Sequence, residues 1–382
     1  LLCVQPVLLM RNGYFTHDRS GNWIARDYAY NMLAPLAPNS FMFTNGDNDT
    51  FPLWYIQQVE GFRKDVRVVN LSLLNTDWYI RQLRDEQPKV PITFDDRMVD
   101  VLGMGAVQDD RGNYIQTNEV MVHHLLQNAR NADGTWKNQP YFAVTVPEHY
   151  GYDNQFVLEG LVYKVLKDSV GAGIDVAATR KALYETFRYR GLFTADGSKD
   201  EKVYKDENSE TLSRNYAAAH LQLAFHYRRQ GDLAGAIAEM NQIVKGFPDF
   251  PEVQLPLGTF LMETGDTAKA MSFFADLARR NPNNPETRYY YGASLAIQGD
   301  MAGSLREFEA SIALDPSYDQ PYFGAYTTLR ATGQEEQAFS YLQRWAQLNP
   351  NDPRAAGILQ AGRGIPGGSQ GGAGSPQPLQ LP

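Results

Sequence analysis

Acidic and amide side chains recur at three places in the first half of this 382-residue chain, each soon after a short apolar run. Such groups can coordinate a hard cation or hydrogen-bond the hydroxyls of a polar ligand. The same residue types also cap helices and form turns, so a purely structural role stays open for each of them. The candidate residues are Asn45, Asp47, Asp49, Asn75, Asp77, Glu148 and His149.

The apolar runs in front of these residues predict the strands of one sheet. Runs 40–44 and 141–146 are short and rich in aromatic residues, and run 66–74 is rich in β-branched ones. Helical spacing follows at 51–61 and again at 78–84, an alternation that is typical of a parallel α/β sheet. Because the carboxyl ends of parallel strands share one edge, we expect the candidate residues to lie along a single rim, where open α/β sheets bind ligands.

The same patterns set the expected domain boundaries. We predict a Rossmann-like α/β domain over 14–190, with a further helix upstream of the first strand that ends before Pro35. Residues 85–140 carry weaker patterns, apart from a helix expected at 118–130. A charged linker is expected at 191–214.

Composition excludes several function classes. The chain has 35 basic and 44 acidic residues, a net charge of −9, which argues against binding to nucleic acid. Cys3 is the sole cysteine, so the chain has no internal disulfide and no cysteine-rich zinc module. Asp47 and Asp49 have the D-x-D spacing with which many nucleotide-sugar transferases hold a metal ion, but such a short pattern is common in acidic chains. We predict neither a metal nor a cofactor.

A period of 34 residues organises the second half. Gly, Pro and small residues each recur four times with this spacing, which is the signature of tetratricopeptide (TPR) repeats. The three series are Gly231, Gly265, Gly299 and Gly333; Pro248, Pro282, Pro316 and Pro350; and Ala236, Ala270, Ser304 and Ala338. We predict an all-α TPR solenoid of about four repeats.

Each series has a physical role. The glycines are expected to end the first helix of each repeat with a positive φ, and the prolines to end the second. Asp232, Asp266 and Asp300 are expected to cap the second helices, whereas Gln334 makes a weaker cap. The repeats and a short capping helix are expected over 215–361, followed by a disordered Gly/Pro-rich tail at 362–382.

The first helices of a TPR array line a groove that usually holds a polypeptide. Helical spacing alone does not distinguish a groove position from a contact between helices, so both alternatives stay open. The residues expected to face the groove are Leu221, Phe225, Arg228, Leu255, Met262, Tyr289, Phe323 and Arg330.

The first 13 residues have two interpretations. The segment LLCVQPVLLM is too short to span a bilayer and starts with Leu rather than Met. We interpret 1–13 either as an N-terminal segment of the α/β domain or as the stump of a membrane span.

Three segments carry a family resemblance: HDRSGNWIARDYAYNML at 17–33, TNGDNDTFPLWYIQQVEGFRKDVRVVNLSLLNTDWY at 44–79 and LEGLVYKV at 158–165. They resemble the part that follows the membrane spans in a bacterial polytopic family similar to protein O-mannosyltransferases of the GT-C type. The resemblance covers roughly the first 190 residues. It implies an enzyme that moves a sugar from a lipid-linked donor to protein hydroxyls.

The resemblance also implies where this portion would act. It predicts a membrane-associated, extracytoplasmic (periplasmic) portion, non-catalytic by itself, that contacts the membrane portion of the same protein and binds acceptor polypeptides through its TPRs. No catalytic residue is carried over, because the family's catalytic residues lie among membrane spans that this chain lacks. A lipid-linked sugar is a further expected ligand. The alternative is a non-enzymatic TPR scaffold with a sugar- or peptide-binding α/β domain.

Overall fold

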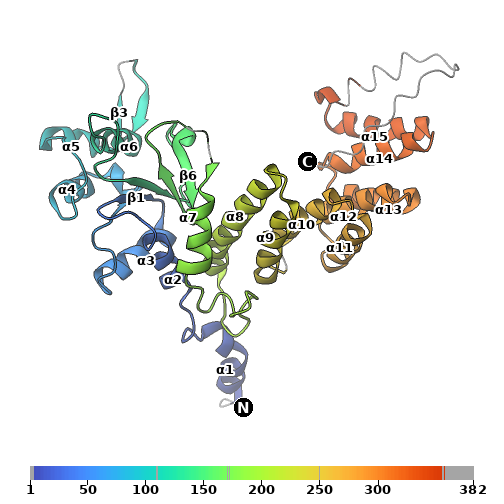
Figure 1. Ribbon diagram of the computed structural model, residues 1–382, viewed down its shortest axis with the longest axis horizontal. Helices are drawn as coiled ribbons and strands as arrows, with labels where there is room; N and C mark the ends of the chain where they lie inside the picture. Colours follow the sequence, from blue (N-terminus) through green and yellow to red (C-terminus); the bar gives the residue numbers. More distant parts are fainter. Residues whose placement is uncertain are drawn as a thin grey trace. The chain divides into compact units, whose positions relative to one another are not determined.

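The computed structural model describes residues 4–108, 111–169, 171, 173–248, 250–354 and 357. The chain forms two compact units, the first made of Leu1–His226 with Lys245–Phe247 and the second of Tyr227–Val244 with Pro248–Pro382. Figure 1 shows an α/β arrangement in the first unit and stacked helices in the second. Among the residues described, no helix has the length and apolar character needed to cross a membrane.

A six-stranded, mostly parallel sheet forms the centre of the first unit, which confirms the predicted α/β class. The strand order is β2-β1-β5-β7-β6-β8. β1 is parallel to both of its neighbours, whereas β7 is antiparallel to β5 and β6. The strands are β1 (Phe41–Thr44), β2 (Arg67–Asn70), β5 (Pro140–Ala143), β6 (Phe156–Glu159), β7 (Val162–Val165) and β8 (Gly173–Ile174).

Helices cover both faces of this sheet. In Figure 1 helices α2 and α3 lie below the sheet, and α5 and α6 lie above it. The chain passes from β1 to β2 in one direction and from β2 back past β1 to β5 in the other, so the sheet has a topological switch point between β1 and β5. The helices are α1 (Val4–His17), α2 (Ile24–Leu33), α3 (Asp47–Gln58), α4 (Asp77–Asp85), α5 (Asp96–Leu102), α6 (Thr117–Asn128) and α7 (Val176–Lys181).

The short strands predicted from apolar runs are buried on both faces. Every residue of β1 and β5 is buried, as expected for central strands with helices on either side. The rings of Phe43, Phe142 and Phe156 form a row across the sheet, with centroids 4.6 and 4.9 Å apart. The hairpin of β3 (Ala106–Gln108) and β4 (Tyr114–Gln116) was not predicted.

Helix α2 is fixed in the first unit by polar side chains that are almost fully buried. Asn31 is 0% exposed, and its amide nitrogen donates to the Tyr216 hydroxyl at 2.7 Å and to the Arg188 carbonyl oxygen at 2.8 Å. The Arg188 amide donates back to the Asn31 side-chain oxygen at 2.7 Å. Arg190 donates to both carboxylate oxygens of buried Asp27. These polar residues of segment 17–33 therefore position α2.

The predicted linker at 191–214 is partly structured. Helix α8 (Glu207–Arg229) begins inside it, and Leu212 and Tyr216 of this helix belong to the core of the first unit. Phe193 also forms a β-bridge with Lys199. The run of charged residues between 196 and 210 predicts a linker, although the apolar residues on either side of it pack in the core.

Arg63 holds the turn that follows α3 against the end of α2. Its guanidinium donates to the carbonyl oxygens of Leu33 and Leu36, both at 2.8 Å, and to that of Ala37 at 3.0 Å. It also binds the Asp65 carboxylate at 2.8 and 2.9 Å. Arg63 therefore satisfies carbonyl groups that the end of a helix leaves without partners.

This ion pair predicts a pH-dependent contribution to stability. The Arg63 hydrogen bonds lower the pKa of Asp65 from 3.8 to about 2. A carboxyl group with a depressed pKa stabilises the folded state above its unfolded pKa and loses this contribution as pH falls through its folded pKa. We expect the difference in unfolding free energy between wild type and Arg63→Gln to be constant above pH about 5 and to shrink towards pH about 2. Urea titrations of both proteins at several pH values measure this difference in unfolding free energy. A difference that does not vary with pH would contradict the ion pair of Arg63 and Asp65.

The second half folds as the predicted TPR array. Gly231, Gly265, Gly299 and Gly333 have φ of 80, 83, 88 and 74° and end the first helices. The small residues that follow at 236, 270, 304 and 338 are each 0% exposed, so the paired helices pack closely. The helices after α8 are α9 (Leu233–Gly246), α10 (Pro251–Glu263), α11 (Thr267–Arg280), α12 (Pro285–Ile297), α13 (Met301–Leu314), α14 (Gln320–Ala331) and α15 (Glu335–Leu348).

The expected caps are also present. The side chains of Asp232, Asp266 and Asp300 each accept a hydrogen bond from the backbone N–H three residues later. Gln334 makes no side-chain capping bond, as its residue type predicts. The end of the range 215–361, in which the short capping helix was expected, lies outside the described residues apart from 357, as does the whole tail at 362–382.

Candidate functional site

Asp49 is the centre of a hydrogen-bond network at the carboxyl ends of the parallel strands. Its carboxylate accepts from the Thr145 hydroxyl at 2.5 Å and from the Asn45 backbone N–H at 3.2 Å. The hydroxyl of Thr50 lies 3.4 Å from the other carboxylate oxygen. The Thr50 hydroxyl is also hydrogen-bonded to the Thr44 hydroxyl at 2.8 Å. The side-chain amide of Asn70 donates to the same Thr50 hydroxyl at 2.9 Å. Residues that follow β1 and β5 are thus joined directly across the switch point.

The centre of this network is buried, whereas Thr145 is partly exposed and Asn45 is exposed. Asp49 is 1% exposed, and Thr44 and Thr50 are 0% exposed. Burial raises the pKa of Asp49, because removal from water disfavours the charged carboxylate, and the hydrogen bonds of Thr145 and Asn45 oppose that rise. Burial, and next the nearby Asp49 charge, raise the pKa of the Tyr28 phenol. Both oxygens of Asp49 are therefore occupied by the protein's own groups, at the strand ends where open α/β sheets bind ligands.

Four of the other predicted rim residues bond to partners outside the Asp49 network. Asn75 accepts from the Asn118 backbone N–H at 2.9 Å and caps α6. Asp77 pairs with Arg81 at 2.7 Å within α4. These two residues follow β2 and serve its connecting helices.

The residues after β5 also bond locally. Glu148 accepts from the backbone N–H of Tyr150 at 3.1 Å, and His149 pairs with Asp153 at 2.6 Å. The His149 ring also packs 4.8 Å from the ring of Phe156. Of the seven predicted rim residues, Asn45 and Asp49 are joined by a hydrogen bond, and four of the others bond to different partners.

The two carboxylates of the D-x-D spacing lie in different surroundings. Asp47 and Asp49 lie in the first turn of α3, which begins earlier than predicted, and Asp47 is exposed whereas Asp49 is buried. Within the described ranges, no three His, Cys, Asp or Glu side chains are grouped closely enough to hold a metal ion.

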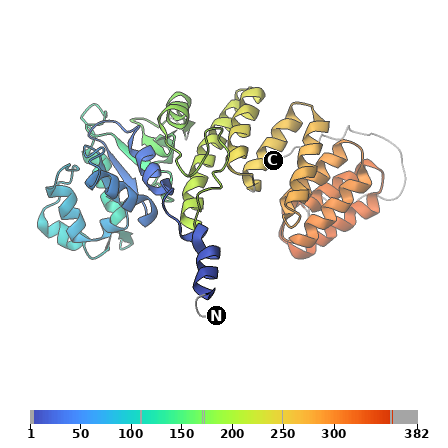
Figure 2. The same ribbon diagram turned by 90° about the horizontal axis from the view of Figure 1, so that it is seen from below.

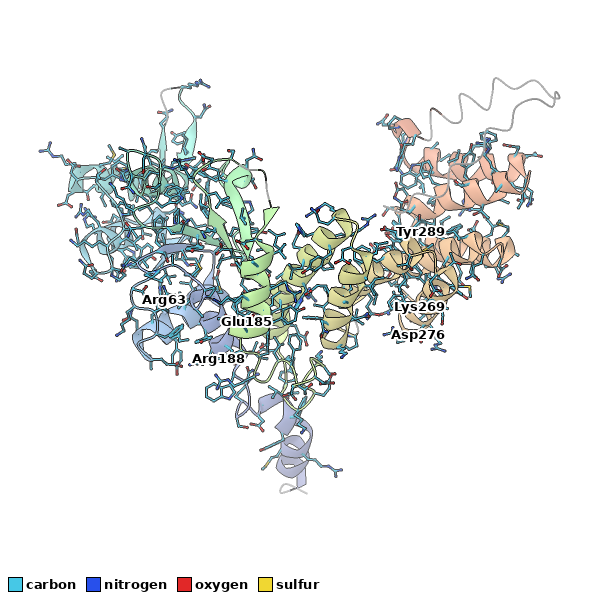
Figure 3. All side chains as sticks on the ribbon, in the orientation of Figure 1. Arg63, Glu185, Arg188, Lys269, Asp276 and Tyr289 are labelled. Atoms are coloured by element: carbon cyan, nitrogen blue, oxygen red, sulfur yellow. The ribbon has the colours of Figure 1, made fainter. Side chains whose placement is uncertain are left out.

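Residues predicted to line the TPR groove differ in exposure. Leu255 and Tyr289 are only 6% and 2% exposed, so their side chains belong to the core between helices and not to an open groove. Figure 3 labels Tyr289 on α12, where its ring packs 5.7 Å from Phe308. Leu221, Phe225, Arg228, Met262 and Phe323 are half-buried, and Arg330 is exposed.

Three of these side chains make defined contacts. Arg228 forms a two-pronged ion pair with Glu263 of α10, at 2.9 and 2.7 Å. Phe323 packs beneath the guanidinium of Arg354, 4.8 Å from its ring centroid. Arg330 lies 3.4 Å from Glu335 and remains open to solvent on the other side.

Sequence reasoning missed a pocket of about 520 Å³ beside the edge strand β2. Trp54 of α3, Trp78 of α4 and Arg67 of β2 are among the residues that line it. The available signal was the pair of tryptophans in segment 44–79 at positions that helical spacing does not assign to a core face.

Two protein families match parts of the chain. Residues 25–101 match the family described as TMEM260-associated domain 2, and residues 227–291 match the tetratricopeptide repeat family. The first match contains α3, α4, the strands β1 and β2, the whole pocket lining and all of α2 except its first residue. The chain therefore carries a segment similar to a TMEM260-associated domain together with TPR repeats.

A curated relative shows the same connection at low identity. The chain is 23% identical over 128 residues to the protein O-mannosyl-transferase TMEM260 of Mus musculus. This alignment covers 33% of the chain and only 18% of the length of the mouse protein. The similarity is thus distant and concerns a small part of that enzyme.

Solved structures resemble a part of the chain. A crystal structure of MamA is 21% identical with a TM-score of 0.32 and covers 37% of this chain and 85% of its own. YrrB, described as a TPR protein with an unusual peptide-binding site, is 19% identical with a TM-score of 0.32, over 40% of this chain and 79% of its own. MamA from Desulfovibrio magneticus RS-1 is 12% identical with a TM-score of 0.32, and the match covers 38% of this chain and 87% of its own.

Proposed function

We propose that this chain is a non-catalytic, extracytoplasmic portion of a membrane glycosyltransferase related to protein O-mannosyltransferases, and that its TPR array binds the acceptor polypeptide. The combination of a TMEM260-associated domain with TPR repeats in one chain carries this proposal. The distant similarity to an O-mannosyl-transferase supports the reaction class. TPR arrays generally bind peptides or protein segments, which supports the role of the second unit.

The α/β unit supports a non-catalytic role. Asp49 is the buried carboxylate at the ends of β1 and β5, and its oxygens are taken by Thr145, Thr50 and the Asn45 backbone. A carboxylate that serves as a catalytic base must reach its substrate within hydrogen-bond distance. Asp49 at 1% exposure has no such access in this structure.

A transfer assay tests the assignment of roles. Purified chain alone, given polyprenyl-phosphate mannose and a threonine-rich peptide, should form no mannosylated peptide. Added in excess to membranes that carry out this transfer, it should lower the rate because it withholds the peptide from the enzyme. Turnover by the chain alone would overturn the non-catalytic role, and an unchanged membrane rate would overturn the acceptor-binding role.

Peptide binding should depend on the first helices of the repeats. Replacing Met262 and Arg330 together with alanine should weaken binding of the threonine-rich peptide at least about fivefold, because each truncation removes an accessible contact. Fluorescence anisotropy with a labelled peptide measures this. The matched control is Arg279→Ala on the second helix α11, whose side chain is 78% exposed and should leave affinity unchanged. Equal losses in both proteins would contradict a groove on the first helices.

A further inference from the structure

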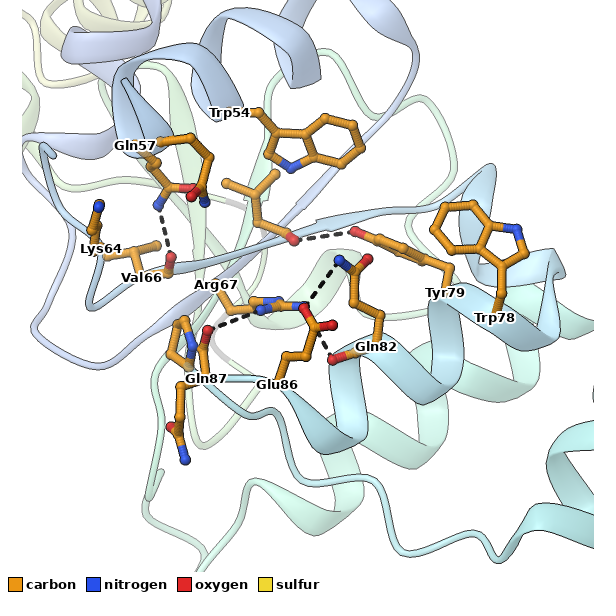
Figure 4. Close-up of a pocket in the computed structure, with 13 residues that line it drawn as sticks. Trp54, Gln57, Lys64, Val66, Arg67, Trp78, Tyr79, Gln82, Glu86 and Gln87 are labelled. Atoms are coloured by element: carbon orange, nitrogen blue, oxygen red, sulfur yellow. Dashed lines mark hydrogen bonds between the residues drawn. The ribbon is translucent and has the colours of Figure 1, made fainter. Parts of the chain in front are cut away.

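The pocket beside β2 combines several features of a ligand-binding site. It has a volume of about 520 Å³ and lies between α3 and α4. Figure 4 shows Arg67 on the strand between the two helices, with Trp54 on the α3 side and Trp78 on the α4 side. Its lining is Trp54, Gln57, Gln58, Lys64, Val66, Arg67, Val68, Trp78, Tyr79, Gln82, Glu86, Gln87 and Pro88.

The pocket has a positive charge that the protein leaves partly uncompensated. Arg67 donates to the carbonyl oxygens of Gln87 and Gln82, both at 3.3 Å, and no carboxylate in the described part of the chain forms an ion pair with it or with Lys64. Glu86 attracts Arg67 from a distance, while its carboxylate accepts from the Gln82 amide at 3.1 Å. Burial lowers the pKa of Arg67, since its charge is partly removed from water. The lining therefore carries two cations and one anion in a chain of net charge −9.

Two indoles and several amides accompany this charge. Trp78 is 53% exposed and Trp54 is half-buried, so both have ring surface facing the pocket or solvent. Exposed aromatic faces stack on the C–H faces of flat or cyclic ligands. Gln58 contributes a side-chain amide, which both donates to and accepts from hydroxyl groups.

We propose that this pocket binds an acidic saccharide, a hydroxylated ring whose carboxylate or phosphate pairs with Arg67 and whose ring lies against Trp78. A half-buried guanidinium held only by two long bonds to carbonyl groups gains a charge-assisted pair when an oxyanion enters. The amides of the lining match the ring hydroxyls, and the indole matches the apolar face of the ring. This site does not depend on the proposed peptide-binding role, because its residues lie in the first unit and its test uses no polypeptide.

Calorimetry with four probes tests the proposal on the full chain. The probes are glucose 6-phosphate, glucuronate, methyl glucoside and inorganic phosphate. We expect one or both of the charged sugars to bind at least tenfold more tightly than methyl glucoside, which lacks the charge, and than phosphate, which lacks the ring. Binding of glucuronate alone identifies a sugar acid, and binding of glucose 6-phosphate alone identifies a sugar phosphate.

Variants separate this site from binding elsewhere. Arg67→Gln should weaken binding of the charged sugar at least about tenfold, the usual size of a lost charge-assisted pair. Trp78→Ala should weaken it several-fold and Trp78→Phe less, since phenylalanine keeps an aromatic face. Arg97→Gln on the exposed surface of α5 is the matched control and should leave the affinity for the charged sugar unchanged. Circular dichroism and melting temperature confirm that each variant is folded.

Three results would overturn the proposal. One is no heat with any probe, and another is methyl glucoside bound as tightly as the charged sugars. The third is a folded Arg67→Gln protein with unchanged affinity, because the oxyanion would then lie elsewhere.

Discussion

Replacing Asn31 with leucine should destabilise the first unit by about 3 kcal/mol or more. The change removes a side chain that satisfies the Arg188 N–H, the Arg188 carbonyl and the Tyr216 hydroxyl at once. Leaving buried polar groups unsatisfied costs about 1–3 kcal/mol each. Because whole domains have only about 5–15 kcal/mol of stability, a large part of it would be lost.

Tryptophan fluorescence during urea unfolding measures this effect. Four of the five tryptophans, Trp23, Trp54, Trp78 and Trp136, lie in the first unit, so the signal reports mainly on that unit. Asn208→Leu is the control, since Asn208 is exposed and should change stability by less than about 0.5 kcal/mol. An Asn31→Leu protein as stable as this control would show that the buried bonds are not needed.

Replacing Gly292 with valine should destabilise the TPR array by about 3 kcal/mol. A Cβ atom at this position would lie 2.9 Å from two carbons of the Phe308 ring and 3.1 Å from the Ser304 carbonyl oxygen. Phe308 is 0% exposed, and Gly324 approaches the ring from the next repeat, where a Cβ would lie 2.8 Å away. The ring is held between two helices and has no free space into which to move, so overpacking must distort the helix pair.

A second substitution distinguishes overpacking from a general loss of helix stability. Phe308→Leu in the Gly292→Val background should recover part of the loss, because the smaller side chain leaves room for valine. Urea unfolding followed by circular dichroism at 222 nm gives the coupling energy of this double-mutant cycle. Additive losses from the two changes would mean that the contact is not the cause.

The TPR half could be predicted in detail because its repeats are local. Each glycine, aspartate and small residue acts within its own helix pair, so the 34-residue period fixed both the elements and their caps. The central strands were also readable, since β1 and β5 are continuous apolar runs. The strands β6, β7 and β8 were not predicted, because β7 mixes buried and half-buried residues and β8 has only two residues.

The candidate site was less predictable, for a physical reason. The sequence correctly predicts that Asp49 follows a strand. The hydrogen bond that occupies its carboxylate comes from Thr145, which is distant in sequence and could not be predicted from the local pattern. Asn75 and His149 have the right residue types for a binding site, yet each finds a partner within the fold, in Asn118 and Asp153. A polar side chain is available to a ligand only where the folded protein does not already supply its hydrogen-bond partner.

The Tyr79 hydroxyl has a consequence for how polypeptides can approach the sheet. It accepts from the Asn70 backbone N–H at 3.0 Å and donates to the Val68 carbonyl oxygen at 3.2 Å, and Gln57 donates to the Val66 carbonyl oxygen at 2.8 Å. These bonds occupy main-chain groups on the outer side of the edge strand β2 (Figure 4). An incoming extended segment would have to displace them before it could extend the sheet, so β-augmentation and intermolecular strand pairing are disfavoured at this edge.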